Sequence, residues 1–200
     1  MVKIIHQTWV DSNIPKQYQK NSKSWLNIHT DWEYKLWLDS DIKIFIKDKY
    51  PQYLTLYNNF KHKIQRVDFA KYLIIFECGG LYVDMDVKCF KSINLLLNGL
   101  KDNFFYENVF NKQILGPYIF YSPGKTIALN KIIKHIHNYS KIKQKHNSDI
   151  LEIMNTTGPY MLNLVLNKQD VIKHSSLHFE NVKTLNSYGK HYKDCNWYKK

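Results

Sequence analysis

The sequence predicts an α/β fold, in which strands alternate with helices along a single domain. Segments rich in β-branched and aromatic residues alternate with longer segments in which apolar residues recur at helical spacing. The chain has 200 residues, of which 44% are hydrophobic and 15% aromatic, so it can bury a core and is not disordered. Alternation of this kind is typical of a central sheet covered by helices.

The expected elements follow one another as far as residue 139. In chain order they are a strand over residues 2–8, a helix over about 15–26, a strand over 33–38, a helix from 39 to 50, a long helix over 62–78, strands over 81–83, 103–107 and 114–121, and a helix over 125–139. Residues 140–147 are polar and rich in lysine, which indicates an exposed linker or a loop between two helices. Residues 176–200 are expected to be irregular.

Local signals set the ends of the helices. Pro15 suits the first turn of a helix because the N–H that proline lacks has no intrahelical partner there. Asp39 or Ser40 offers a side-chain oxygen that can cap the next helix. Gly79 is expected to stop the long helix, and Thr157 to cap a short helix late in the chain.

The charge of the chain favours anionic partners. Basic residues number 29 and acidic residues 17, which gives a formal net charge of +12. Arg66 is the only arginine, although proteins that read bases or clamp phosphates favour its planar, bidentate fork. No specific binding to nucleic acid is therefore expected, and a lysine-rich binder of single strands is kept as an alternative.

Cysteine usage and hydropathy indicate the compartment. The three cysteines are odd in number and show no CxxC spacing, which favours a reducing environment. The N-terminal residues are too polar for a signal peptide, and no run approaches the ~18 apolar residues that would span a bilayer. We expect a cytoplasmic protein without a transmembrane segment, unless an anchor precedes Met1.

Asp84 and Asp86 are the most informative residues, because they stand two positions apart where an apolar strand ends. Side chains at this spacing lie on one side of an extended chain, so both carboxylates can converge on one hard cation such as Mg²⁺ or Mn²⁺. Gly79 and Gly80 allow a sharp turn into this strand. Ligands bind at the carboxyl ends of strands in open α/β sheets. The plainer alternative is a pair of solvated aspartates.

The order of motifs resembles the DXD-containing sugar-transferring region of glycosyltransferase family 32. That family includes initiating mannosyltransferases, capsular polysaccharide transferases and, more distantly, clostridial glucosylating toxins. The most specific part reads Asp68-x-x-Lys71-Tyr72 and then Gly79-Gly80-x-Tyr82-x-Asp84-x-Asp86. Further similar segments follow the family's order at residues 3–9, 36–39, 111–124, 157–159 and 191–197.

The resemblance implies a fold and an activity. The fold is of the GT-A type, a Rossmann-like nucleotide-binding mixed sheet flanked by helices, over a single domain of residues 1–200. Residues 1–120 would bind the nucleotide sugar, and 121–200 would form the helical, acceptor-side part with a closing C-terminal segment. The activity would be retaining transfer from a UDP- or GDP-linked sugar to a glycan, protein or lipid-linked acceptor, with Mn²⁺ or Mg²⁺ as cofactor. No obvious carboxylate nucleophile pairs with the site, so the double-carboxylate scheme of retaining hydrolases is not indicated. The resemblance implies front-face attack, with the acceptor hydroxyl beside the leaving phosphate.

The resemblance also implies a role for each matching residue. Asp68, Asp84 and Asp86 would be catalytic. Asp86 would bind the metal directly. Asp84 would touch the ribose, the donor sugar or a metal-bound water, and His191 would approach the metal or the diphosphate. The residues implied to bind the donor are Gln7, Thr8, Trp9, Asp68, Lys71, Asp84, Asn111, Asn196 and Trp197.

Two departures from the family pattern keep alternatives open. Lys71 stands where the family has arginine, and Asn196 stands where serine is common. Lysine keeps the charge but loses the bidentate fork, so a weak or inactive nucleotide-sugar-binding relative is one alternative. The string at residues 83–86 is also similar to the haloacid-dehalogenase phosphatase signature, but Lys88 replaces its threonine.

Overall fold

A computed structural model describes residues 1–142, 146–167, 169–179 and 187–194 and confirms the α/β fold class. Its central sheet has six strands in the order β2-β1-β3-β6-β5-β7. The strands are β1 (Ile4–Trp9), β2 (Glu33–Leu38), β3 (Gly80–Val83), β5 (Asn103–Val109), β6 (Lys112–Ser122) and β7 (Ile172–His174). β1 is parallel to β2 and β3, and β5 is parallel to β7. β6 is antiparallel to both β3 and β5, which makes the sheet mixed.

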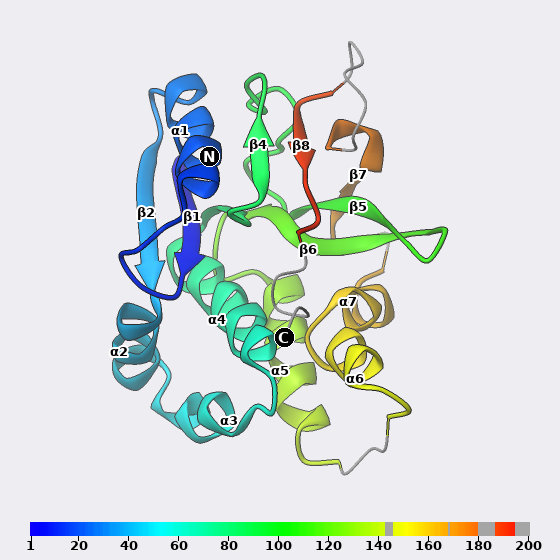
Figure 1. Ribbon diagram of the computed structural model, residues 1–200. Coiled ribbons are helices and arrows are strands. Elements are labelled where there is room, and N and C mark those ends of the chain that lie inside the picture. The colour runs from blue at the N-terminus through cyan, green and yellow to red at the C-terminus, as the bar shows by residue number, and fades with distance from the viewer. Residues whose placement is uncertain (143–145, 168, 180–186, 195–200) are drawn as a thin grey trace.

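Helices and a small second sheet cover the central sheet (Figure 1). The helices are α1 (Lys16–Ile28), α2 (Asp39–Lys49), α3 (Leu54–Asn59), α4 (Lys63–Cys78), α5 (Ile127–Tyr139), α6 (Asp149–Thr156) and α7 (Pro159–Val165). Short 3₁₀ turns lie at Pro51–Tyr53 and Ser176–His178. The antiparallel strands β4 (Val87–Cys89) and β8 (Gly189–His191) form the second sheet. None of the helices in the described ranges is both long and apolar enough to cross a membrane.

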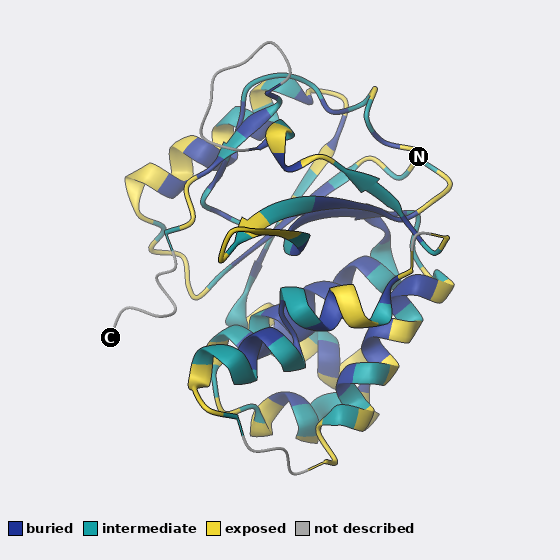
Figure 2. Ribbon diagram, turned by 90° about the vertical axis from the view of Figure 1, so that its right-hand side faces the viewer, coloured by how far each residue is buried: buried dark blue, intermediate teal, exposed yellow. Residues whose placement is uncertain are grey.

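The alternation of side chains along each strand builds two hydrophobic cores. Tyr82 packs on one face with α2, α4, α5 and α7. Its neighbours Leu81 and Val83 pack on the other face with Trp25 of α1 and with β4. Successive side chains of a strand point to opposite faces, so a continuous apolar run is expected where both faces are covered. Figure 2 shows the buried strands between these two layers.

The turn from α4 into β3 depends on two glycines. Gly79 and Gly80 have φ angles of 67° and 99°, which side chains other than glycine rarely adopt. A Cβ added to Gly80 would lie 2.5 Å from the carbonyl oxygen of Ile4 in β1. The absence of these side chains therefore lets β3 enter the sheet directly beside β1.

Several predicted element ends are wrong. Leu38, and neither Asp39 nor Ser40, is the N-cap of α2, and its N–H donates to Asp41 Oδ2 over 3.0 Å. Gly158 is the N-cap of α7, whereas the Thr157 hydroxyl donates to a buried carboxylate. The sequence-based prediction also missed α3, α6 and the short strands β4, β7 and β8.

Candidate functional site

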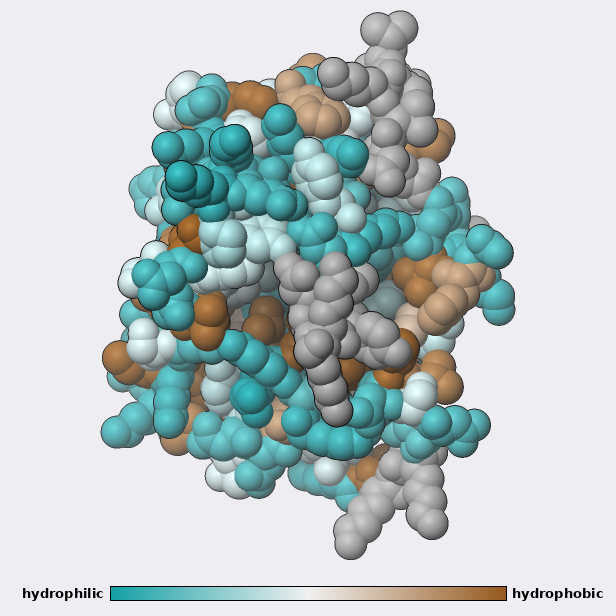
Figure 3. All heavy atoms as spheres, viewed as in Figure 1, coloured by the Kyte–Doolittle hydropathy of each residue, from teal (hydrophilic) through white to brown (hydrophobic). Residues whose placement is uncertain are grey.

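A cleft of ≈ 810 Å³ opens at the carboxyl ends of β1 and β3. Its polar side is lined by Thr8, Asp68, Lys71, Asp84, Asp86, Glu107, His191, Lys193 and Asp194. Its apolar side is lined by side chains of α4, α6 and the β5–β6 hairpin, which include Ile64, Val67, Val109, Phe110, Ile153 and Met154. Figure 3 shows hydrophobic side chains across the middle of this face of the molecule, between hydrophilic regions. The cleft therefore lies where open α/β sheets bind ligands.

The acidic turn after β3 is held from behind by α1. The Asn21 amide donates to the Met85 carbonyl over 3.0 Å, and the Trp25 indole N–H donates to the Val87 carbonyl over 2.9 Å. The Asp84 N–H donates to the carbonyl of Tyr118 over 2.8 Å. These bonds satisfy the backbone of the turn, so both aspartate side chains are left to face the cleft.

Asp84 receives a relayed hydrogen bond. The Tyr82 hydroxyl donates to Asp84 Oδ1 over 2.8 Å, and the Thr8 hydroxyl lies 2.9 Å from the Tyr82 oxygen. Burial raises the pKa of Asp84 to about 6; Lys71 opposes the increase and the charge of Asp86 adds to it. The charged form of Asp84 is therefore disfavoured by burial and by Asp86, and favoured by Lys71.

Asp86 is paired with His191 by the second sheet. His191 lies opposite Val87 in the β4–β8 ladder, and its Nε2 is 3.5 Å from Asp86 Oδ2. Burial alone would raise the pKa of Asp86, but His191 and the Asp194 N–H together lower it below the ordinary value. The His191 ring stacks on Tyr118 with 4.3 Å between centroids.

Asp68 and Lys71 form a buried ion pair on α4. Lys71 Nζ is 2.7 Å from Asp68 Oδ1 and 3.8 Å from Asp84 Oδ1. The Thr157 hydroxyl donates to the other Asp68 oxygen over 2.9 Å. Burial opposes a charged Lys71, but Asp68 and Asp84 outweigh it and raise the pKa of Lys71. The pair therefore connects the helix that carries Asp68 with the acidic turn.

The remaining predicted site residues are placed differently. Thr8 and Trp9 line the cleft, and Trp9 packs on Tyr18 with 4.8 Å between ring centroids. The indole N–H of Trp9 is buried without a hydrogen-bond partner among the described residues.

Other predicted site residues do not line the cleft. Gln7 is fully buried and accepts a hydrogen bond from Tyr34. Asn111 lies in the exposed β5–β6 turn with φ of 60° and is not brought to the cleft. Asn196 and Trp197 lie outside the described residues.

The donor atoms of the acidic turn fit a hard divalent cation. The side chains of Asp84 and Asp86 are 32% and 16% exposed, so their oxygens reach the cleft. Within the described ranges, the group whose three ligand atoms gather within 4.8 Å lies elsewhere, at His62, Asp149 and Glu152. Asp84, Asp86 and His191 do not gather this closely among the described residues. The carboxylate oxygens of Asp84 and Asp86 are of the ligand type that Mg²⁺ and Mn²⁺ prefer.

Sequence reasoning missed residues that support this site. Tyr82 and Thr157 stand inside the quoted motifs, yet Tyr82 was given no role and Thr157 was expected only to cap a helix. Tyr118 supplies the ring on which His191 stacks. Glu107 puts a carboxylate into the cleft wall. The one signal for Glu107 is its position as an acidic residue inside a strand that is otherwise mostly apolar.

The fold and the cleft define an α/β protein built to bind a ligand beside paired carboxylates, and comparison with known proteins identifies the class. Residues 15–104 match the glycosyltransferase sugar-binding region containing DXD motif. The solved structure of PaToxG glycosyltransferase shares the fold with a TM-score of 0.59 at 14% identity, covering 84% of this chain and 69% of that one. The predicted GT-A type of fold is thereby confirmed.

Two curated relatives are transferases. Inositol phosphoceramide mannosyltransferase 3 of Schizosaccharomyces pombe is 30% identical over 163 residues, which are 82% of this chain and 44% of the relative. Initiation-specific alpha-1,6-mannosyltransferase of Saccharomyces cerevisiae is 32% identical over 98 residues, 45% of this chain and 20% of the relative. The chain therefore spans less than half the length of these relatives.

The chain carries the DXD-containing glycosyltransferase region and is a relative of these glycosyltransferases, as the resemblance predicts. The matches favour this class over the phosphatase-like and nucleic-acid-binding alternatives.

Proposed function

We propose that this chain is a metal-dependent, retaining glycosyltransferase that uses a nucleoside diphosphate sugar. The observation that supports the proposal is that one cleft, at the carboxyl ends of β1 and β3, is lined by three groups. They are the acidic turn at Asp84 and Asp86, the Asp68–Lys71 pair and Trp9. A cleft lined by converging carboxylates and a buried lysine suits a ligand that has both a diphosphate and several hydroxyls.

Different residues of the cleft would bind different parts of the donor. Asp84 and Asp86, with His191 beside them, would hold a divalent cation, Mn²⁺ or Mg²⁺, which stabilises negative charge on a departing diphosphate. The Asp68–Lys71 pair would bind hydroxyls of the donor sugar, because its carboxylate accepts and its ammonium donates hydrogen bonds. Thr8 and Trp9 would lie against the nucleoside, with the unpartnered indole N–H of Trp9 as a donor. Asn196 and Trp197 would close over the diphosphate.

The names of the relatives suggest substrates to test first. Both curated relatives are mannosyltransferases, and one is named for inositol phosphoceramide. We therefore propose a hexose, with mannose tested first, linked to GDP or UDP, and an acceptor that is a glycan, a protein or a lipid-linked group. The cytoplasmic location and the division into donor and acceptor parts near residue 120 stay predictions.

A donor panel tests the proposal. UDP- and GDP-linked hexoses, each with and without Mn²⁺, are added to the native protein, and both the melting temperature and the release of nucleoside diphosphate are measured. We expect one donor to raise the melting temperature and to release diphosphate only when Mn²⁺ is present. If no donor does either, the proposal is wrong.

The carboxylate variants make the test specific. Asp86→Asn should abolish diphosphate release and the Mn²⁺-dependent shift, while the melting temperature without ligand stays close to native because the group is not part of the core. Asp48→Asn, which changes a 67% exposed aspartate on α2, is the matched control and should behave as the native protein does. Binding of the donor without any turnover would instead identify an inactive relative.

A further inference from the structure

The chain between β4 and β5 exposes leucine side chains to water. Within residues 93–101, named here the leucine segment, Leu95 is 96% exposed and Leu100 is 86% exposed. Met1, itself 47% exposed, lies beside the segment, because a Cβ added to Gly99 would be 2.7 Å from Met1 Cβ. A single exposed apolar residue is normal on a protein surface, but several at one place indicate a surface that binds a partner.

The leucine segment is held in this shape by the body of the molecule. Ile93 and Leu97 are buried in one of the two hydrophobic cores. The Trp32 indole N–H donates to Asn94 Oδ1 over 3.0 Å. Leu95 lies between these anchored positions, so its exposure follows from the fixed path of the backbone.

The elements around the leucine segment carry lysines and no acidic residue. Neither aspartate nor glutamate occurs in α1, β4, β8 or residues 90–101. α1 reaches the segment, because the Ile93 N–H donates to His29 Nε2 over 3.1 Å. Lys88 and Lys190 lie directly opposite each other in the β4–β8 ladder, an arrangement that like charges oppose. The lysines of these elements include Lys20, Lys23, Lys88, Lys91, Lys101 and Lys190.

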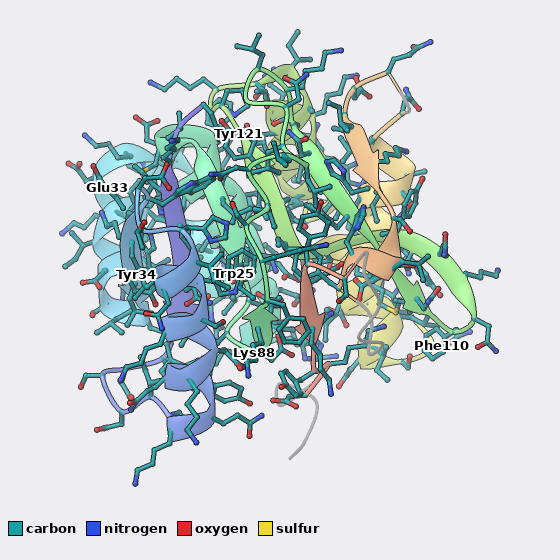
Figure 4. All side chains as sticks on the ribbon, turned by 90° about the horizontal axis from the view of Figure 1, so that it is seen from above. Trp25, Glu33, Tyr34, Lys88, Phe110 and Tyr121 are labelled. Atoms are coloured by element: carbon teal, nitrogen blue, oxygen red, sulfur yellow. The ribbon has the colours of Figure 1, made fainter. Side chains whose placement is uncertain are left out.

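The neighbouring aspartates do not offset this charge at the surface. Asp86 and Asp194 line the cleft. Asp102 is buried, and Asp31 is paired with Lys3. Figure 3 shows hydrophilic side chains gathered over α1 and β4, and Figure 4, seen from above, shows Lys88 between α1 and β8. This end of the molecule is therefore positively charged and attracts anions.

The leucine segment and the cleft lie at opposite ends of β1. Thr8 and Trp9, at the carboxyl end of β1, line the cleft, whereas Met1 beside Gly99 stands before its amino end. In Figure 1 the segment follows β4 near the top of the view, away from the carboxyl ends of β1 and β3. A partner bound to the leucine segment would therefore leave the cleft open.

The charge and the kind of apolar side chain select one partner among three. A second copy of this chain would place lysines against lysines across a two-fold interface, which like charges oppose. A single-stranded nucleic acid is bound by stacking on aromatic side chains, whereas the fully exposed side chains of this segment are aliphatic. A bilayer with acidic lipids offers anionic headgroups to the lysines and acyl chains to the leucines.

We propose that the leucine segment docks this protein on an anionic lipid bilayer. Leu95 and Leu100 enter the boundary between headgroups and acyl chains, while the lysines around them lie against acidic headgroups. The cleft then faces water on the side away from the bilayer. The proposal is independent of the proposed function, since no residue of the segment lines the cleft.

Flotation with phospholipid vesicles tests the proposal. Native protein is mixed with vesicles of phosphatidylcholine, with or without phosphatidylserine, and the bound fraction is measured. We expect binding to the phosphatidylserine vesicles alone, and weaker binding in high salt because ions screen the attraction. Leu95→Ser/Leu100→Ser should weaken binding about tenfold or more, with an unchanged melting temperature because neither side chain is in the core. Ile44→Ser/Leu164→Ser, which changes exposed apolar residues of α2 and α7, is the matched control.

A charge variant and a fluorescent probe make the test specific. Lys101→Glu should weaken binding about fivefold or more, whereas Lys47→Glu, exposed on α2, should not. In Leu95→Trp, the added tryptophan fluorescence should shift to shorter wavelength on phosphatidylserine vesicles, because the ring leaves water. Leu164→Trp should show no such shift.

Four results would overturn the proposal. They are a native protein that binds neither kind of vesicle, and equal binding by the native protein and Leu95→Ser/Leu100→Ser. Self-association that this double variant abolishes, without vesicle binding, would identify a second copy as the partner. Salt-sensitive binding of an oligonucleotide that Lys101→Glu weakens, again without vesicle binding, would identify a nucleic acid.

Discussion

At the scale of single residues, the cleft depends on a buried pair of opposite charges. The side chains of Lys71 and Asp68 are only 2% and 4% exposed. Removing a charge of this kind from water is costly, so each partner is tolerated only because the other is present. The same burial fixes both groups in one orientation, with the Thr157 hydroxyl on the second oxygen of Asp68.

Lys71→Met should lower the free energy of unfolding by about 3 to 5 kcal/mol, because it leaves Asp68 as an uncompensated buried charge. The double variant Asp68→Asn/Lys71→Met should recover a substantial part of that loss, since both charges are then absent. Urea unfolding of the native, single and double variants measures both effects.

The matched control is Lys3→Met. Lys3 pairs with Asp31 on the surface, where the two side chains are 43% and 51% exposed. Water screens such a pair, so its loss should leave the stability nearly unchanged. Equal destabilisation by Lys3→Met and Lys71→Met would show that the buried pair has no special role.

At the scale of elements, α1 acts as the support of the acidic turn. Its residues donate to the carbonyls of Met85 and Val87, and its Ser24 hydroxyl accepts from the Cys89 N–H over 2.9 Å. A strand end that carries two carboxylates must be held by neighbours, because like charges repel each other. The geometry of the proposed cation site is therefore set by a helix that contributes no ligand.

Asn21→Ala should loosen this support. It removes the donor to the buried Met85 carbonyl, and we expect the free energy of unfolding to fall by about 1 to 3 kcal/mol. The Mn²⁺ concentration needed for half of the donor-induced thermal shift should rise. Lys20→Ala, one position earlier on the exposed side of α1, should change neither quantity. An unchanged Mn²⁺ requirement in Asn21→Ala would show that the turn holds its shape without this bond.

At the scale of the whole molecule, stability should depend on pH through a buried histidine. His6 Nε2 bonds to the Gly79 carbonyl over 3.0 Å, so it carries the proton, and Nδ1 accepts from the Trp37 indole over 3.0 Å. Burial lowers the pKa of His6 from 6.5 to about 4. The neutral ring therefore links β1, β2 and the turn before β3.

Acidification should destabilise the native protein within this pH window. The unfolded chain binds a proton on His6 as the pH falls through 6.5, whereas the folded chain resists protonation down to about 4. The stabilising contribution is thus complete above pH 6.5 and is lost progressively toward pH 4, by about 3 kcal/mol in total. Urea unfolding from pH 7 to pH 4 measures the slope. His6→Gln should show a shallower slope, and an identical slope in both proteins would exclude His6 as the cause.

Local chemistry made part of the fold predictable. The structure places β2 at the predicted residues 33–38 and ends α4 at Cys78, because alternating residues and a glycine stop act through near neighbours. The strands β4 and β8 have three residues each, too few for a periodic pattern, and β8 exists as a strand through its pairing with β4. The polar stretch at residues 140–147 does lie between two helices, as its composition predicts, although α6 itself was not predicted.

The candidate site also combines residues that local patterns predict with residues that only distant contacts place. Asp84 and Asp86 were predictable because a carboxylate pair at a strand end is a local pattern. Gln7 was misplaced because its side chain is buried and accepts a hydrogen bond from Tyr34 of β2, a contact that depends on which strand lies beside β1. Glu107 could not have been placed from the sequence, because its orientation depends on the bare backbone of Gly116 in another strand.

The sequence by itself determined the α/β class, the family resemblance and the acidic turn, since each is encoded in residues that are close along the chain. The tertiary structure decided which side chains meet: His191 reaches Asp86 through strand pairing, Thr157 reaches Asp68, and Glu107 enters the cleft. These contacts join segments up to about a hundred residues apart. Only the packing of the sheet and its helices brings such segments together, because no local pattern specifies which distant strand becomes a neighbour.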